Sequence, residues 1–294
     1  MGTVLHSYLL HNGEIRSSSQ PLLTAGQVGL LSGWGVFTTM RVVDGIPFAF
    51  ERHWTRMVRD AAALKVPMPT DSESVRRNLL DLIEANRAFR STLRLVVVRN
   101  RGGLWEGPSA GGPSDVIALT AASKDWGSSV KLSYVPQARH AANEFAGTKI
   151  LSWAMNLTWI ERAQARGFDE VILLNERGEV AECTSANIFI AQENEVWTPP
   201  LNSGCLPGIT REILIGETLV PGVRVRERTL APCDLEQADE VFITSTTRNL
   251  LPVTQIEGRN VGRSDRIRAA LEGAFENFVS RYVTRNRPVT ATGV

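Results

Sequence analysis

The sequence predicts a mixed α+β protein built from two domains, and three observations support this. The chain has 294 residues, which is enough for one large or two medium domains with separate cores. Strand-like and helix-like segments come in blocks and do not alternate strictly, which is typical of α+β proteins. The polar segment SKDWGSS has the composition of a linker. We therefore expect a smaller N-terminal domain over 1–122, a linker over 123–129 and a larger C-terminal domain over 130–294.

The composition is that of an ordinary globular protein, with 43% apolar and 21% charged residues. The formal net charge of +1 does not favour nucleic acid or an anionic membrane surface as a partner. No apolar run approaches the roughly 18 residues of a membrane helix, and the first residues do not resemble a secretory signal. Three scattered cysteines, Cys183, Cys205 and Cys233, favour a reducing cytoplasm over a disulfide framework or a zinc site.

In the first half, the pattern predicts strands and turns up to VFTTMRVVDGIPF, in which the Asp-Gly pair is a hairpin signal. A helix is expected near 51–64, where apolar residues recur at helical spacing. These residues are Trp54, Met57, Ala61 and Leu64. A second helix is expected over about 71–88, and TLRLVVVRN, rich in β-branched residues, is expected to form a strand. The Gly- and Pro-rich segment at 101–115 is expected to be a long loop, and such loops are usually functional or mobile.

In the second half, a strand, VKLSYV, is expected before a helix that follows Lys149. The helix should end at Gly167 and bury an apolar face made by Trp153, Leu157 and Ile160. The segments EVILL, EVAEC, NIFIAQ and EVWTP are expected to form a meander of strands.

Three further elements are expected near the C-terminus. LPGITREILIGETL should be a loop that opens onto a helix, with Thr210 as the N-cap. DEVFITSTT should be a strand that ends in hydroxyl groups, and a last helix should run over about 264–282 before a frayed tail.

Two charged residues of the second half stand in apolar or strand-like surroundings. Lys149, in AGTKILSW, would have a nucleophilic amine if desolvation lowered its pKa. The alternative is a surface lysine whose stem packs on apolar groups. Glu182 interrupts a strand of buried character, and a buried carboxylate is costly unless a cation faces it. A protonated ring nitrogen would be such a cation, and an ordinary strand edge or salt bridge is the alternative.

Two segments could bind anions. PGIT, at 207–210, opens a predicted helix, whose first amides and Thr210 hydroxyl would suit an anion. TSTT, at 244–247, ends a predicted strand with hydroxyls and free amides, although a locally bonded turn is the alternative. Two arginines of the first half are weaker candidates. Arg56 lies away from the apolar stripe of its helix and could be solvated, and Arg94 begins an apolar strand and could protect a sheet edge.

None of these features is specific alone, but together they match what pyridoxal phosphate (PLP) requires. The cofactor needs an amine for its aldehyde, a carboxylate for its ring nitrogen and donors for its phosphate.

The order of the motifs resembles that of the class IV aminotransferases, the fold-type IV PLP enzymes, over about residues 8–282. The family includes branched-chain aminotransferases, D-amino-acid aminotransferases and aminodeoxychorismate lyases. The matching segments are GWGVFTTMRVVDG, ERHWTRM, GTK, RGFDEVILLNERGEVAECTSANIF, LPGITRE and DEVFITSTTRNLLPV. The resemblance implies a two-domain fold similar to that of D-amino-acid aminotransferase.

The resemblance also implies individual roles. Lys149 resembles the lysine that forms the Schiff base, and Glu182 is similar to the glutamate that pairs with the pyridinium nitrogen. Arg56 looks like the phosphate-binding arginine, and Leu206 resembles the residue packed against the ring. The other implied phosphate contacts are Ile209, Thr210 and Thr246.

The residues expected to meet the substrate match no single branch of the family. Trp34 and Thr38 replace two acids of the usual Gly-Asp-Gly-Val-Phe-Glu, and the Phe-Thr-Thr run is more like the lyases. Branched-chain enzymes often have Tyr-x-Arg where Arg94 stands, and the 101–115 loop lacks the Arg-x-His pair of the D-amino-acid enzymes. Substrate contacts are expected from Thr38, Arg94, Thr246 and Thr247.

The expected function is that of a PLP-dependent aminotransferase, which moves an amino group between an amino acid or amine and a 2-oxo acid through an aldimine on Lys149. The first alternative is an aminodeoxychorismate lyase that releases pyruvate with the same cofactor. The second is a binding protein on a retired enzyme scaffold, against which the presence of both Lys149 and Glu182 argues. The resemblance further implies a homodimer, and the net charge and lack of a long apolar run predict neither nucleic acid nor membrane as a partner.

Overall fold

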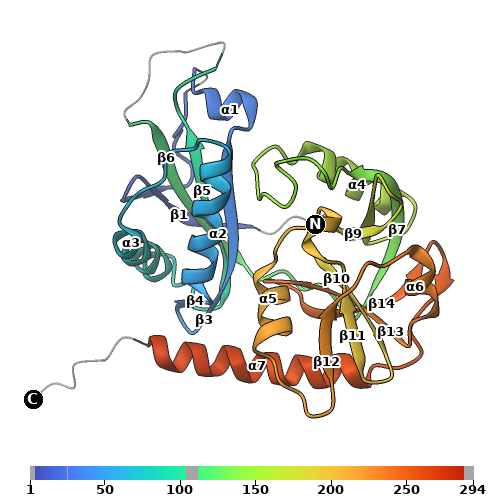
Figure 1. Ribbon diagram of the computed structural model, residues 1–294. Coiled ribbons are helices and arrows are strands. Elements are labelled where there is room, and N and C mark those ends of the chain that lie inside the picture. The colour runs from blue at the N-terminus through green and yellow to red at the C-terminus, as the bar shows by residue number, and fades with distance from the viewer. Residues whose placement is uncertain (1–3, 25, 104–111, 288–294) are drawn as a thin grey trace, which may run out of the picture. The chain divides into compact units, whose positions relative to one another are not determined.

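The chain divides into two compact units in the computed structural model, which describes residues 4–24, 26–103 and 112–287 (Figure 1). The first unit combines residues 1–124 with 276–294, and the second consists of residues 125–275. The boundary at 124 lies inside the predicted linker, but the end of the chain groups with the first unit and not with the second. Whether the predicted boundaries delimit independently folding domains stays a prediction.

The first unit contains a six-stranded antiparallel sheet in the order β2-β1-β6-β5-β3-β4. Its strands are β1 (Leu5–His11), β2 (Glu14–Ser17), β3 (Gly35–Val43), β4 (Ile46–Pro47), β5 (Ser91–Arg99) and β6 (Ser114–Ala122). Its helices are α1 (Val28–Ser32), α2 (Phe50–Ala63) and α3 (Ser72–Ala85). The predicted helices near 51–64 and 71–88 and the predicted strand over TLRLVVVRN are therefore confirmed.

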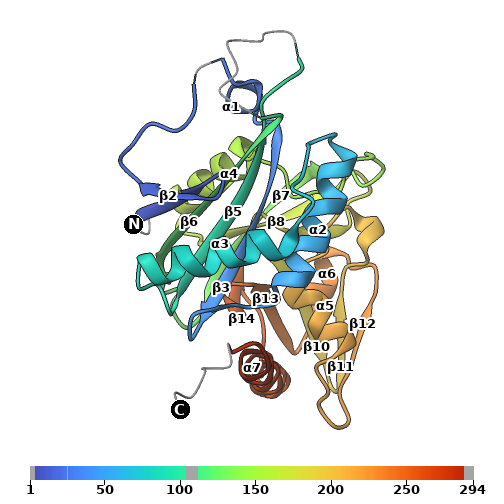
Figure 2. The same ribbon diagram turned by 90° about the vertical axis from the view of Figure 1, so that its left-hand side faces the viewer.

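Helices α2 and α3 cover one face of this sheet (Figure 2). The core between these helices and the sheet contains the buried residues Val36 and Met40 of β3, Leu93 of β5, Met57 of α2 and Leu79 of α3. Residues two apart on a strand face the same side, so this core holds every second residue of β3. Helix α3 begins where the carboxylate of its N-cap, Asp71, accepts a hydrogen bond from the Ser74 amide.

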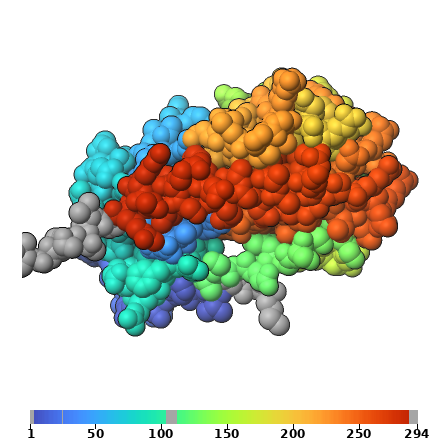
Figure 3. Space-filling model, turned by 90° about the horizontal axis from the view of Figure 1, so that it is seen from below, coloured from blue at the N-terminus to red at the C-terminus, as the bar shows by residue number. Residues whose placement is uncertain are grey.

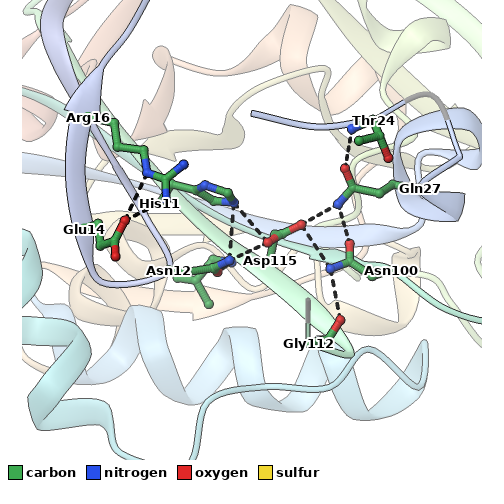
Figure 4. Close-up of polar contacts among 10 residues, drawn as sticks. His11, Asn12, Glu14, Arg16, Thr24, Gln27, Asn100, Gly112 and Asp115 are labelled. Atoms are coloured by element: carbon green, nitrogen blue, oxygen red, sulfur yellow. Dashed lines mark hydrogen bonds and ion pairs between the residues drawn. The ribbon is translucent and has the colours of Figure 1, made fainter. Parts of the chain in front are cut away.

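A buried polar network lies at the start of β6 (Figure 4). The Asp115 carboxylate accepts hydrogen bonds from the side chains of His11 (3.0 Å), Asn12 (2.5 Å), Asn100 (3.0 Å) and Gln27. The Asn100 amide nitrogen also donates to the Gly112 carbonyl, and the Asn100 backbone amide donates to the Pro113 carbonyl. The network therefore joins the two ends of the segment that was predicted as a long loop. Residues 104–111 of that loop lie outside the described residues.

The last helix, α7 (Arg266–Asn286), begins in the second unit, and its later residues belong to the first. One side of it lies on the surface (Figure 3). Phe278 and Tyr282 pack edge-on against Phe48 with ring centroids 6.2 and 5.3 Å apart. The Tyr282 hydroxyl donates to Glu51 and accepts from the Phe50 amide. The C-terminal turns of α7 thus complete the aromatic core of the first unit.

The second unit contains a nine-stranded mixed sheet. Its main order is β12-β11-β10-β13-β14-β7-β8-β9, and β15 pairs with β14. The strands are β7 (Val130–Arg139), β8 (Glu170–Asn175), β9 (Val180–Cys183), β10 (Asn187–Gln192), β11 (Glu195–Thr198), β12 (Arg224–Glu227), β13 (Glu240–Ser245), β14 (Asn249–Ile256) and β15 (Arg259–Asn260). The helices, besides the start of α7, are α4 (Ala154–Ala165), η1 (Leu201–Ser203), α5 (Ile209–Gly216) and α6 (Pro232–Gln237).

The two faces of this sheet carry different helices. Ile188 of β10, Ile243 of β13 and Leu235 of α6 belong to the main core on one face. Leu173 of β8 packs with Ala163 of α4 on the other. Register pairs Leu173 with Glu182, and paired residues share a face, so Glu182 lies on the face that carries α4.

Three predictions about the second unit are wrong in detail. Strands β8 to β11 form two separate hairpins and not one meander, because β10 pairs with β13 and not with β9. Helix α4 begins five residues after Lys149, and its buried residues are Asn156 and Ala163, whereas Leu157 of the predicted apolar face is 50% exposed. The N-cap of α5 is Gly208, and Thr210 lies in the first turn of the helix.

Candidate active site

Glu182 is a buried carboxylate near the end of β9, 8% exposed, and it has two donors. The Arg139 Nε donates to Oε1 and the Leu206 backbone amide donates to Oε2, both at 3.0 Å. Glu182 therefore has both features of the predicted alternative, because β9 is an edge strand of the sheet and the carboxylate forms a salt bridge. Arg139, at the end of β7, was missed because nothing in PQARH distinguishes it from other arginines.

The loop that donates the Leu206 amide also lies against the segment that precedes Lys149. Gly147 has a φ of +73°, and a Cβ at this position would lie 2.9 Å from the Cys205 carbonyl oxygen. Only glycine therefore allows this turn to approach the loop. Lys149 follows two residues later and is half-buried. Burial, with a further contribution from the charge of Glu182, raises the pKa of the Cys205 thiol to about 11.

The same loop opens helix α5. Its N-cap, Gly208, has no side chain to accept hydrogen bonds from the first turn, whose amides have no partner within the helix. A Cβ on Gly208 would clash with Asn187 Oδ1, and the Asn187 Nδ2 donates to the Leu206 carbonyl at 2.9 Å. Ile209 and Thr210 are buried in this first turn.

The end of β13 lies beside these residues, because Asn187 pairs with Thr244 in the sheet. The Thr244 Oγ1 is buried and has no hydrogen-bond partner among the described residues. Thr246 and Thr247 follow in a half-buried turn. In the second unit, the structure therefore brings together the Lys149 segment, Glu182, Leu206, the start of α5 and the end of β13. Most of these are joined through the 205–208 loop.

In the first unit, Arg56 is 7% exposed and is not a solvated arginine. Its Nη2 donates to the Thr38 hydroxyl at 3.0 Å, and the same hydroxyl lies 2.6 Å from the His53 Nδ1. His53 follows Arg52 in ERHWTRM and was not predicted, although its spacing of three residues from Arg56 places both on one side of α2.

Thr38 and Arg94 lie on opposite faces of the six-stranded sheet. Thr38 pairs with the buried Leu95, whereas Arg94 pairs with Thr39, the next residue on β3. The Arg94 guanidinium lies over the Phe37 ring at 4.7 Å, and the residue is exposed. The structure thus separates two residues that were expected to share the substrate, and their substrate contacts stay predictions.

The residues of the second unit fit PLP. The cofactor offers a phosphate, for which uncapped helix amides, the Thr210 hydroxyl and the orphaned Thr244 hydroxyl are suitable donors. It also offers a pyridinium nitrogen, for which a fixed, buried carboxylate such as Glu182 is a suitable acceptor. Among the described residues, no group of three or more His, Cys, Asp or Glu could hold a metal ion, and no helix is long and apolar enough to cross a bilayer.

This fold and this set of residues define a PLP-dependent enzyme. Residues 35–256 match the family described as "Amino-transferase class IV". The branched-chain-amino-acid aminotransferase of Escherichia coli K12 is 27% identical over 299 residues, which cover 94% of this chain and 95% of the relative. The D-alanine aminotransferase of Bacillus licheniformis is 28% identical over 258 residues, which cover 86% of this chain and 90% of the relative.

A solved structure shares the fold. It is that of a hypothetical aminotransferase from Mycobacterium tuberculosis in its PLP-bound form. It aligns with a TM-score of 0.83 at 24% identity and covers 93% of this chain and 99% of its own. The chain belongs to the class IV aminotransferases, whose cofactor is PLP. The resemblance, the fold class and the aminotransferase function expected from the sequence are thereby confirmed.

Proposed function

We propose that this aminotransferase holds its cofactor on Lys149, with Glu182 on the ring nitrogen and the start of α5 on the phosphate. The observation that carries the proposal is the 205–208 loop. Its Leu206 amide donates to Glu182, its Cys205 carbonyl lies against the turn before Lys149, and its Gly208 begins α5. PLP, when bound, supplies an electron sink for the carbanion of an amino acid.

The residues of this chain would act as follows. The Lys149 amine would move a proton from the substrate α-carbon, which requires the neutral form of the amine. Glu182 would keep the ring nitrogen protonated, since its two donors fix the carboxylate in one orientation as an acceptor. The first-turn amides of α5, Thr210 and Thr246 would hold the phosphate. For Arg56 the phosphate role and for Leu206 the ring contact are proposed on the family resemblance.

The proposed substrates are amino acids and 2-oxo acids, which both carry a carboxylate. Arg94 supports this, because its guanidinium stacks on Phe37 and forms no ion pair with any residue in the described part of the chain. A guanidinium that forms no ion pair within the protein is available to pair with the carboxylate of a ligand. Thr246 and Thr247 are the other proposed substrate contacts.

We also propose a homodimer in the cytoplasm. Helix α4 exposes Met155 and Leu157, and the exposed Phe145 lies in the segment before it. Exposed apolar residues that gather in one region are typical of an interaction surface. Three free cysteines support a reducing compartment. Sedimentation of the active protein at micromolar concentration tests the dimer, and a fully active monomer would disprove it.

Replacement of Lys149 tests the proposed function. The chain has four lysines, and the exposed Lys131 on β7 provides a matched control. After incubation with PLP and borohydride, the wild type and Lys131→Ala should carry the cofactor covalently, and Lys149→Ala should not. Mass spectrometry of the labelled peptide checks this.

The activity is checked with a screen of L-amino acids, D-amino acids and chiral amines as donors. Consumption of each donor is followed with and without a 2-oxo acid. Transfer that requires the acceptor supports the aminotransferase. Pyruvate release from aminodeoxychorismate without an acceptor would favour the lyase. Labelling of Lys149→Ala to the wild-type extent would mean that another residue holds the cofactor.

A further inference from the structure

Arg248 and Glu170 form a buried ion pair in the second unit, outside the residues that the proposed function uses. The Arg248 Nη2 lies 3.1 Å from Glu170 Oε2, and the side chains are 5% and 1% exposed. Burial lowers the pKa of the Arg248 guanidinium, and the charge of Glu170 opposes this effect. The Trp126 ring covers the guanidinium at 3.7 Å from its centroid. A pair so completely removed from water requires further hydrogen bonds.

These hydrogen bonds come from the turn that follows β9. The Arg248 Nη1 donates to the Ser185 carbonyl at 3.1 Å and to the Ser185 hydroxyl at 2.9 Å. The Ser185 and Thr184 hydroxyls both donate to the Glu170 carboxylate. Thr184 is two residues beyond Glu182, so the ion pair fixes the backbone that ends the Glu182 strand.

Arg248 also closes the turn that holds Thr246 and Thr247. Its backbone amide donates to the Ser245 hydroxyl and to the Ser245 carbonyl, both at 3.2 Å. One residue therefore ends the hydroxyl-rich turn through its backbone and holds the other turn through its side chain. A third element joins the same network, because the Asn156 amide of α4 donates to the Thr184 carbonyl at 2.8 Å.

The free-energy balance of such a pair argues against a purely stabilising role. A buried ion pair is often no more stabilising than an apolar pair of the same volume, because both charges lose their hydration. In addition, the Arg248 Nε is buried without a hydrogen-bond partner among the described residues. What the pair supplies, and an apolar pair would not, is a fixed direction for four hydrogen bonds to Thr184 and Ser185 in the turn after β9.

We propose that Arg248 is a positioning residue, which through Glu170 and Ser185 sets the place of Thr246 relative to Glu182. The inference rests on the proposed function, in which these two residues contact the phosphate and the ring nitrogen of one rigid cofactor. A rigid ligand that is held at both ends is sensitive to their separation, and a shift of about 1 Å in a positioning group can reduce a rate by about 100-fold. Arg248 itself contacts neither cofactor nor substrate in this proposal.

Two variants of the full chain test the inference. Arg248→Lys keeps the charge and so the pairing with Glu170, but one ammonium cannot reach Glu170 and both Ser185 oxygens with the arginine geometry. The double variant Glu170→Gln with Arg248→Met removes both charges and leaves no buried ion without a partner. Arg228→Met is the matched control, because Arg228 also stacks on a tryptophan, Trp197, and pairs with an acid, Asp234.

The measurements are the Kd of PLP for the folded protein, the free energy of unfolding, and kcat and KM. We expect the Kd of PLP to rise about tenfold or more in both variants and kcat to fall more than KM changes, whereas the control should stay within about twofold. These changes should appear even where the stability is that of the wild type.

Wild-type Kd and kcat in a folded Arg248→Lys or in a folded double variant would overturn the inference. Loss of stability in both, with cofactor affinity of the folded fraction unchanged, would also overturn it, because it would show a structural role alone. Absence of Lys149 labelling in the wild type would instead refute the proposed function, and so the two failures are distinguishable.

Discussion

Two donors of different kinds hold the Glu182 carboxylate, the Arg139 guanidinium on one oxygen and the Leu206 amide on the other. A carboxylate that is charged and fixed before a ligand arrives does not have to be reoriented when a second cation binds. This is the arrangement expected of a group that stabilises a protonated cofactor ring.

Glu182→Gln tests this residue, since the amide keeps the shape and removes the charge. We expect the variant to fold and to bind PLP, because the phosphate contacts are elsewhere. The rate of α-proton abstraction should fall by about 100-fold or more, as expected when a preorganised charge is removed from a site shielded from water. Rapid-mixing kinetics of the amino-acid half-reaction measures this rate.

A suitable control is Glu195→Gln, because Glu195 pairs with Arg224 at an exposed site where the charge contributes little. A half-reaction of Glu182→Gln as fast as that of the control, with cofactor bound, would show that this glutamate faces something other than the ring.

Sequence reasoning identified only some residues of the candidate site. Lys149, Glu182 and the PGIT segment could be proposed as candidates, because each is an unusual residue type in its local pattern. Arg139 and Arg248 could not be predicted, because each is one of 28 arginines and acts only through contacts made by folding. The placement of Thr38 and Arg94 on opposite faces of the sheet could not be predicted either, since it depends on the strand register and not on spacing along the chain.

For the helices, the spacing of apolar residues predicted which segments are helical, but it did not always predict which face of the helix packs against the sheet. Helix α2 follows its predicted stripe, with Met57 and Ala61 buried. Helix α4 does not, because it packs against the sheet through Ala163 and Trp159, whereas Leu157 of the predicted face is exposed. Apolar spacing identifies an amphipathic helix, but an apolar face that is exposed to solvent looks the same in sequence.

The network at Asp115 ties strands β1 and β6 to the segment before α1 (Figure 4). Asp115→Asn would place an amide group against side chains that donate hydrogen bonds, so at least one bond would be lost in a buried site. We expect a loss of about 2–4 kcal/mol in the free energy of unfolding. Asp71→Asn is the control, because asparagine caps a helix as well as aspartate does.

The loss of unfolding free energy in Asp115→Asn should become smaller as the pH falls. Burial alone would raise the pKa of the Asp115 carboxyl, but hydrogen bonds from Asn12, Asn100 and His11 outweigh it, so the pKa lies below 3.8. The folded state therefore favours the ionised carboxyl, and its contribution is present above the unfolded pKa and lost as the pH falls through the folded pKa. Urea unfolding should show a large difference between wild type and variant at about pH 7 and a smaller one at about pH 2.5. An equal difference at both would show that the charge of Asp115 is not involved.

At the scale of the whole molecule, the first unit depends on the end of the chain. Phe278 and Tyr282 of α7 pack against Phe48, and Arg41 pairs with Glu276 at 3.1 Å. Removal of residues 276–294 should therefore destabilise the first unit by more than the roughly 3–5 kcal/mol of a single buried aromatic residue.

Hydrogen exchange measured by mass spectrometry would show this loss region by region. Protection should fall across residues 26–103 and persist in the strands of the second unit. Phe278→Ala should give an intermediate effect and Leu219→Ala, at a position that is 87% exposed, little. Full protection of the first unit in the truncated chain would contradict the assignment of α7 to it.

The dependence of the first unit on residues after 275 has a consequence for synthesis on the ribosome. Residues 125–275 are contiguous and emerge together, whereas the first unit is complete only when residues 276 onward have also emerged. At about 5–20 residues per second, the intervening 150 or so residues delay it on the order of ten to thirty seconds. During that interval Phe48 and its neighbours lack their partners on α7. The first unit is therefore the part of the nascent chain that stays incomplete longest, and its early strands are the part that a chaperone would have most time to meet.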